Sequence, residues 1–160
     1  MRRLTANLNA NYSNAADLVR SGIFGGRGGS FFDDVQLHNP LGIVGIRALR
    51  IRYGNQIDSI QATYLLAGPS GYTAPRRGGT GGVETFIQFS LGEVITDVRG
   101  WTNHGVVDRL MFITNTRTYG PYGVTGSTPF HVQERIIGFY GRVGQIMDAI
   151  GFYYLRKFSL

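Results

Sequence analysis

Apolar and polar residues alternate along much of the chain, which is the pattern of a β-strand with one buried face. The clearest runs are Leu49-Arg50-Ile51-Arg52-Tyr53 and Phe86-Ile87-Gln88-Phe89-Ser90-Leu91, both rich in β-branched and aromatic residues. The segment 15–19 also allows a helical turn, but no amphipathic helix of ordinary length fits after residue 25. We therefore expect an all-β chain of roughly a dozen short strands.

Three glycine-rich clusters echo one another along the chain, and such an internal repeat bears directly on the fold. The clusters are Gly25-Gly26-Arg27-Gly28-Gly29, Gly78-Gly79-Thr80-Gly81-Gly82 and, more loosely, Gly120-Pro121-Tyr122-Gly123-Val124-Thr125-Gly126. Because glycine is frequent in tight turns, each cluster predicts a loop between strands. We expect each cluster to open one of three similar units.

An aspartate at the start of an apolar strand follows each glycine cluster: Asp58, Asp108 and Asp148. Two of these residues close a Gly-x-x-x-Asp turn, Gly54-Asn55-Gln56-Ile57-Asp58 and Gly144-Gln145-Ile146-Met147-Asp148. The middle copy has His104 in place of the glycine, so it is degenerate. The repeat predicts one domain over residues 21–160, with residues 1–20 as an N-terminal arm.

Composition supports a packed globule, because 42% of the residues are hydrophobic and only 16% are charged. The 16 Lys and Arg residues outnumber the 10 Asp and Glu residues, giving a net charge of +6. No dense basic block and no common RNA- or DNA-binding motif occurs, so we expect no specific nucleic-acid partner. The arginine excess keeps acidic polymers open as partners.

Cysteine is absent, which excludes a disulfide framework and a thiolate metal site. His38, His104 and His131 share no metal-ligand spacing, so we expect neither a metal nor a cofactor. No run reaches the about 18 apolar residues of a membrane span, so membrane insertion is not expected. The first 22 residues lack the apolar stretch of a signal peptide. We expect secretion if the sequence is a mature form, with a cytoplasmic location as the alternative.

The ordered set of loop motifs resembles the jacalin-related lectin family over about residues 21–155. The motifs are residues 25–29 with Phe32-Asp33-Asp34, residues 119–123 with Thr128-Pro129-Phe130, and residues 138–142 running into Asp148-Ala149-Ile150-Gly151. The resemblance implies a β-prism of three four-stranded antiparallel sheets with pseudo-threefold symmetry. It also implies a jacalin-like lectin domain over residues 21–160, which is not an enzyme and needs no metal.

Sugar sites in this family lie between a glycine-rich loop and a Gly-x-x-x-Asp turn, and the resemblance implies two such sites here. By position, site 1 comprises Gly29, Gln145, Ile146 and Asp148. Site 2 comprises Gly81, Gly82, Asn55, Gln56 and Asp58. A third pairing, Asp108 with Gly123, departs from the family pattern at His104 and stays a possible degenerate site.

The residue types in these sites suit a sugar. An ionised aspartate accepts two hydroxyl donors at once, turn N–H groups donate to sugar oxygens, and glycine leaves room beside the backbone. Galactose-binding relatives place aromatic residues in the Asp turn and have a cleaved chain. Because Gln145, Ile146 and Met147 are not aromatic and the chain continues unbroken before Gly29, the resemblance implies mannose or glucose, presented on glycans or glycoproteins.

Two alternative functions, a glycosidase and a structural protein, are weighed against the same sequence. A glycosidase ordinarily needs two carboxylates flanking one bond, whereas each expected site has one aspartate. A structural or extracellular-matrix protein could bind acidic polysaccharide through its basic surface. Weak single-sugar sites gain avidity from multiple copies, and exposed strands offer an interface, so we expect a homodimer.

Trp101, Tyr119 and Tyr122 are interpreted as packing residues rather than ligand contacts.

Overall fold

A computed structural model describes residues 16–157, and within this range the chain forms 13 β-strands and no helix. The backbone pairings divide the strands into three groups, and all pairings are antiparallel. The first group contains β1 (Ala16–Gly25), β2 (Ser30–Asp33), β12 (Arg135–Val143) and β13 (Met147–Lys157). The second contains β3 (Ile43–Tyr53), β4 (Ile57–Leu66), β5 (Gly71–Thr73), β6 (Arg77–Gly78) and β7 (Val83–Gln88). The third contains β8 (Ile95–Asn103), β9 (Val106–Thr114), β10 (Thr118–Tyr122) and β11 (Thr128–Val132).

The described residues confirm the expected all-β chain, and the three groups share one strand order, which is consistent with three similar units. A central hairpin, β12–β13, β3–β4 or β8–β9, is flanked on each side by an outer strand. The outer strands are β2 and β1 in the first group, and β11 and β10 in the third. In the second group they are β7 and the short pair β5 and β6, which both lie on β4. One pairing, Ile136 with Ile95, makes the first and third groups a continuous sheet.

The core lies between the three central hairpins, because their alternating residues face inward. Inward positions of β3 and β4 include Leu49, Ile51 and Ile60, which are at most 1% exposed. Phe139 of β12 stacks edge-on against Phe112 of β9, with ring centroids 6.3 Å apart, and so joins the first and third groups. Burial of such aromatic and branched side chains provides the main driving force for folding.

Strand β1 corrects two expectations about the N-terminal segment. Residues 16–19 form a strand and not a helical turn, because Ala16 to Arg20 pair in register with Lys157 to Tyr153 of β13. Leu18 and Val19 pack against the core, so residues 16–20 belong to the sheet rather than to a separate arm. Residues 1–15 of the expected arm lie outside the described residues.

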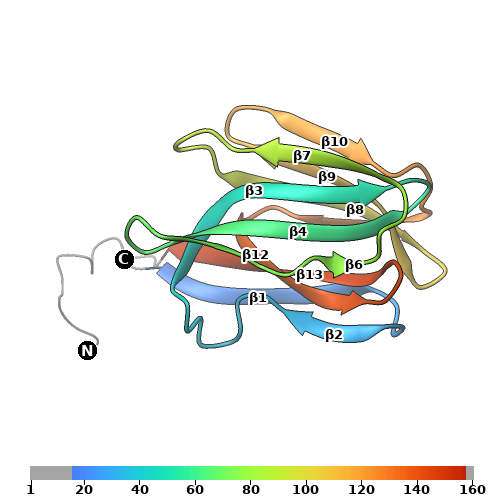
Figure 1. Cartoon of the computed structure of the whole chain (residues 1–160), viewed down its shortest axis with the longest axis horizontal. Helices are drawn as coiled ribbons and strands as arrows, with labels where there is room; N and C mark the ends of the chain where they lie inside the picture. The colour runs from blue at the N-terminus through green and yellow to red at the C-terminus, as the bar shows by residue number, and fades with distance from the viewer. Residues whose placement is uncertain (1–15, 158–160) are drawn as a thin grey trace.

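Three glycine loops and three turns gather at one end of the molecule, on the right in Figure 1. The loops are residues 25–29, 78–82 and 123–127, called here the first, second and third loops. Each turn leads into the second strand of a central hairpin: residues 144–148 into β13, 54–58 into β4, and 104–108 into β9. β1 begins and β13 ends at the opposite end, on the left in Figure 1.

Candidate functional site

Site 1 forms where the first loop crosses the turn of residues 144–148. A methyl group added to Gly28 would lie 2.6 Å from Asp148 Oδ1, and one added to Gly29 would lie 2.6 Å from Asp148 Oδ2. The N–H of Gly26 donates to the Asp148 carbonyl at 2.9 Å and holds loop and turn together. The structure therefore places the carboxylate of Asp148 directly against the two glycines, and the backbone of Val143, 2.5 Å from an added Cβ atom, leaves no space for a larger residue at Gly29.

Site 2 repeats this geometry with the second loop and the turn of residues 54–58. Methyl groups on Gly81 and Gly82 would lie 2.7 Å from Asp58 Oδ1 and 2.8 Å from Asp58 Oδ2. The N–H of Gly79 donates to the Asp58 carbonyl at 3.0 Å. Gly29 and Gly82 also share a φ of +68°, a left-handed conformation that favours glycine. The two sites thus share the same loop-to-turn contacts and the same loop conformation at this glycine.

Both turns leave backbone donors available. The N–H of Gly144 donates to Ile146 O, and the N–H of Gly54 donates to Gln56 O, each at 3.0 Å. No acceptor within residues 16–157 takes the N–H groups of Gln145 and Ile146, or those of Asn55 and Gln56. The side chains of Gln145 and Asn55 are exposed. Each site therefore combines one carboxylate acceptor with neighbouring free N–H donors.

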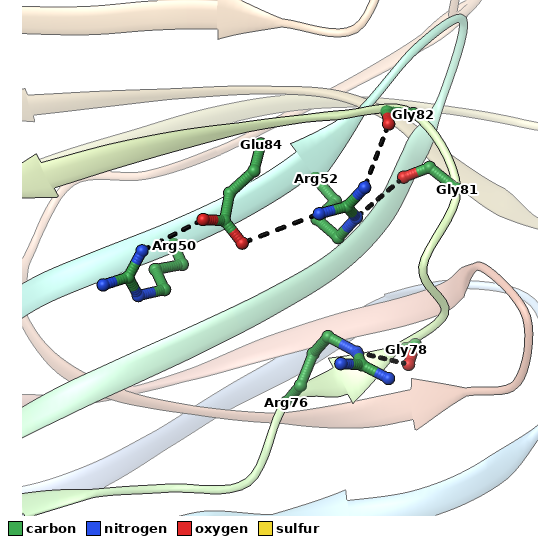
Figure 2. Close-up of polar contacts among 7 residues, drawn as sticks. All are labelled: Arg50, Arg52, Arg76, Gly78, Gly81, Gly82 and Glu84. Carbon is green, nitrogen blue, oxygen red and sulfur yellow. Dashed lines mark hydrogen bonds and ion pairs between the residues drawn. The ribbon is translucent and has the colours of Figure 1, made fainter.

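An arginine clamps the glycine loop of each site, and these two residues were not anticipated. Arg142 donates through Nε to Gly28 O at 3.0 Å and through Nη2 to Gly29 O at 2.9 Å. Arg52 donates in the same way to Gly81 O at 3.0 Å and Gly82 O at 3.1 Å, as Figure 2 shows. A planar guanidinium suits two neighbouring carbonyls because its donors form a rigid fork. A signal was present, since an arginine precedes each Gly-x-x-x-Asp turn by two positions.

The residues beside the two clamping arginines differ in charge. Glu84 of β7 lies between Arg50 and Arg52, with Nη1–Oε distances of 3.0 Å and 3.7 Å (Figure 2). At site 1 the residue paired with Arg142 is Phe31, which is 54% exposed.

Burial raises the pKa of Asp58, while the positive charge of Arg52 acts in the opposite direction. The ionised form of Asp58 is therefore less favoured than that of an ordinary aspartate.

The third pairing is closed. Asp108 is 4% exposed, and its Oδ2 accepts a 2.6 Å hydrogen bond from the hydroxyl of Thr125. Gly123 lies against the Asp108 carbonyl rather than its carboxylate, so it corresponds to Gly25 and Gly78 and not to Gly29. With one carboxylate oxygen bonded inside the protein and the residue 4% exposed, the expected degenerate site presents little of its carboxylate to a ligand.

Substitutions in the third unit account for its closure. By alignment of the loops on Gly25, Gly78 and Gly123, Ser127 stands where sites 1 and 2 have Gly29 and Gly82. The turn pairs Asn103 with Val106 and has left-handed His104 and Gly105 at its tip, which makes a tight two-residue hairpin. Thr102 replaces the clamping arginine, and its carbonyl accepts the N–H of Ser127 at 3.1 Å.

Each glycine loop also contacts a turn from the neighbouring unit, so the three loops and three turns form a closed ring. A methyl group on Gly26 would collide with Gly105 O, and one on Gly79 would collide with Gln145 O. The third loop meets the site 2 turn, where Val124 N–H donates to Asn55 O at 3.2 Å. Each site is therefore supported by a loop from outside its own unit.

The side chains of the other candidate residues contact other parts of the protein rather than the glycine loops of the two sites. Trp101 stacks under Arg109 at 4.2 Å, Tyr122 packs on Tyr53, and Tyr119 donates to Glu93 at 2.8 Å. Residues 16–157 contain no group of three or more His, Cys, Asp or Glu side chains able to hold a metal ion. The described part of the chain also has no helix long and apolar enough to cross a membrane.

Comparison with known proteins identifies the family, because residues 21–153 match the jacalin-like lectin domain. The chain belongs to the jacalin-related lectin family. It is 36% identical over 151 residues to Jacalin-related lectin 19 of Arabidopsis thaliana, covering 86% of this chain and 81% of the relative. It is 39% identical over 121 residues to a galactose-specific lectin of Morus indica, covering 68% of this chain and 76% of that lectin.

A solved jacalin-related lectin has the same fold. The mannose-specific protein from Morus nigra, in complex with mannose, is 30% identical, with a TM-score of 0.76. The match covers 96% of this chain and 99% of that one. The β-prism architecture is thereby confirmed, and the jacalin-related chain is a carbohydrate-binding lectin rather than an enzyme.

Proposed function

We propose that the chain binds mannose- or glucose-type sugars of glycans and glycoproteins at sites 1 and 2, without a metal. The observation that carries this proposal is the duplicated geometry, in which the carboxylates of Asp148 and Asp58 each lie so close to two loop glycines that an added Cβ atom would be 2.6 to 2.8 Å from a carboxylate oxygen. Each copy places a carboxylate acceptor beside free N–H donors, which is the combination that a small polyhydroxylated ligand needs.

The carboxylate is the main acceptor in each proposed site. Vicinal hydroxyls of a hexose can both donate to one aspartate, and each such charge-assisted bond contributes about 1.5 to 3 kcal/mol. The clamps support this role, because Arg52 and Arg142 hold the glycine loops beside the carboxylates. Neither arginine needs to touch the sugar.

The turn N–H groups supply the donors. Gln145, Ile146, Asn55 and Gln56 present backbone N–H groups with no acceptor in residues 16–157. Backbone donors in a braced turn bind without the entropy cost of ordering a long side chain. Side-chain identity in the turns is then free to vary, as Gln145-Ile146 and Asn55-Gln56 do.

Two features support mannose or glucose over galactose. Neither turn contains an aromatic residue, and β1 runs uninterrupted from Ala16 into the first loop. The mannose-bound relative adds support. The galactose-specific relative makes methyl α-galactoside the appropriate competitor in a test of this preference.

The decisive experiment counts sites with single aspartate substitutions. Titration calorimetry with methyl α-mannoside should give two sites per chain for the parent, one for Asp58→Ala or Asp148→Ala, and none for the double variant. Asp17→Ala, at an exposed position of β1 far from the loops, is the matched control and should bind like the parent. Unchanged binding by the double variant would refute the site assignment.

Salt separates this proposal from binding of acidic polysaccharide by the basic surface. Pocket binding of a neutral sugar should persist from about 0.1 to 1 M salt, whereas arginine-driven polyanion binding should collapse as the Debye length falls.

We also propose that the lectin acts as a homodimer, which would present four sites. Sedimentation equilibrium that shows only monomer would exclude the dimer without affecting the site assignment.

A further inference from the structure

The third loop has a role beyond its closed pocket, because it contacts the turn of site 2. Two of its backbone groups converge on one carbonyl: the N–H groups of Val124 and Thr125 lie 3.2 Å and 3.4 Å from Asn55 O. In the first and second loops, the N–H equivalent to that of Val124 instead donates to the aspartate carbonyl of its own unit. The third loop therefore directs a donor outward, to a neighbouring site.

A side chain explains this difference. The positions equivalent to Val124 are Gly26 and Gly79, where a Cβ atom would collide with the turn of the neighbouring unit. Because Val124 has a Cβ atom, the third loop must meet its neighbouring turn in a different arrangement, in which the N–H of Val124 faces Asn55 O.

The hydroxyl of Thr125 fixes this loop to the protein interior. It lies 2.6 Å from Asp108 Oδ2 and 3.3 Å from Asn55 O, and its single hydrogen belongs to the shorter bond with the carboxylate. Because Asp108 is 4% exposed and held in strand β9, it provides a rigid anchor. Anchoring Thr125 in turn sets the position of its backbone against Asn55.

Because the peptide bond is planar, the position of the Asn55 carbonyl sets the direction of the Gln56 N–H. The Asn55 carbonyl and the Gln56 N–H belong to one trans peptide, so they point in opposite directions. A carbonyl held toward the third loop directs the Gln56 N–H away from it, where no acceptor in residues 16–157 takes it. We propose that Asp108 and Thr125 are a positioning pair that fixes the Gln56 N–H as a ready donor in site 2.

Site 1 has no equivalent pair. Its corresponding carbonyl, that of Gln145, is closely approached by Gly79, but it accepts no hydrogen bond from the second loop. The inference rests on the proposed function of site 2, and it predicts an effect confined to that site.

The test compares Thr125→Val with Thr125→Ser in a protein whose only working site is site 2, the Asp148→Ala variant. Thr125→Val should weaken methyl α-mannoside binding by about three- to tenfold, and Thr125→Ser should stay within about twofold of the parent. In the Asp58→Ala variant, which keeps only site 1, both substitutions should leave the affinity unchanged.

An amide NMR spectrum of the sugar-free protein gives a second readout. The Gln56 N–H signal should shift in Thr125→Val and return in Thr125→Ser, while the Ile146 signal should stay constant. Thr114→Val removes another threonine-to-carboxylate bond, to Glu93 at 2.7 Å, at the opposite end of the molecule. It controls for lost stability and should alter neither site.

Three results would overturn the inference: an unchanged Gln56 signal, equal weakening of both sites by Thr125→Val, or an equal effect of Thr114→Val. Failure of the proposed function is distinguishable, because the Asp148→Ala variant would then not bind methyl α-mannoside at all. The Gln56 signal of the sugar-free protein still decides the positioning role in that case.

Discussion

Sites 1 and 2 share a backbone and a carboxylate but hold their glycine loops by different means. Among residues 16–157, Arg142 hydrogen-bonds to loop carbonyls only, reaching Arg27 O, Gly28 O and Gly29 O at 3.2, 3.0 and 2.9 Å. Arg52 bonds to two carbonyls and is also paired with Glu84. Site 2 is further braced by the third loop. One binding geometry can thus be maintained by hydrogen bonds alone or by hydrogen bonds combined with charge.

The two sites should therefore respond alike to added side-chain volume in the glycine loop and differently to a change of the charge beside the clamping arginine. Both have a glycine loop close to the carboxylate, whereas the ion pair with Glu84 belongs to site 2.

The largest expected effect comes from a methyl group in the glycine loop. Gly29→Ala should abolish site 1 and Gly82→Ala should abolish site 2, with losses of about 100-fold or more. The new Cβ atom would collide with the backbone carbonyl of Val143 or Tyr53 and move the loop away from the aspartate proposed to bind the sugar hydroxyls. Calorimetric site counts would check this. Gly42→Ala is the matched control, since Gly42 has a φ of +71° but nothing within 4 Å of an added Cβ. If Gly42→Ala weakened sugar binding as much, backbone strain rather than collision would be the cause.

A pH titration should give the next largest effect, at site 2. Sugar hydroxyls donate to the ionised carboxylate, so affinity is complete above the pKa of Asp58 and declines about tenfold for each pH unit below it. Because burial raises that pKa, the decline should begin above the ordinary aspartate value of about 3.9. Binding of methyl α-mannoside to the Asp148→Ala variant between pH 7 and 4 measures this. A flat profile over that range would contradict the role of Asp58 as an ionised acceptor.

The smallest expected effect comes from the charge beside the clamp. Glu84→Gln should weaken site 2 by about two- to threefold at low salt and leave site 1 unchanged, since exposed ion pairs contribute about 0 to 1 kcal/mol. Glu134→Gln removes a comparable exposed pair with Arg156 and is the control. Equal changes at both sites would show that Glu84 acts through the whole protein rather than through Arg52.

Local sequence patterns predicted the strands and the positions of both glycine loops and aspartate turns. Alternation identified β3 and β7, and the Gly-x-x-x-Asp spacing singled out Asp58 and Asp148. His104 indicated that the third unit departs from the pattern of the other two. The hydrogen bond of Thr125 to Asp108 could not be predicted, because the folded chain brings the third loop to the aspartate.

The start of β1 also escaped prediction. Residues 16–20 lack a strong alternating pattern, and they become a strand by pairing with β13, more than a hundred residues away. The arginine clamps were missed for a related reason. Each arginine contacts a loop distant in sequence, so its role is visible only once the hairpin and loop are brought together.

The pairing of Ala16 with Lys157 places both described ends of the domain side by side, at the end opposite the glycine loops of sites 1 and 2. A polypeptide, dye or surface tether joined through this end would leave both proposed sites facing outward. The same adjacency means that a short linker could join the two ends and new ends could be opened elsewhere, such as between β7 and β8. The molecule is therefore a natural module for tandem arrays and immobilised glycan sensors, in which orientation is set by the attachment point.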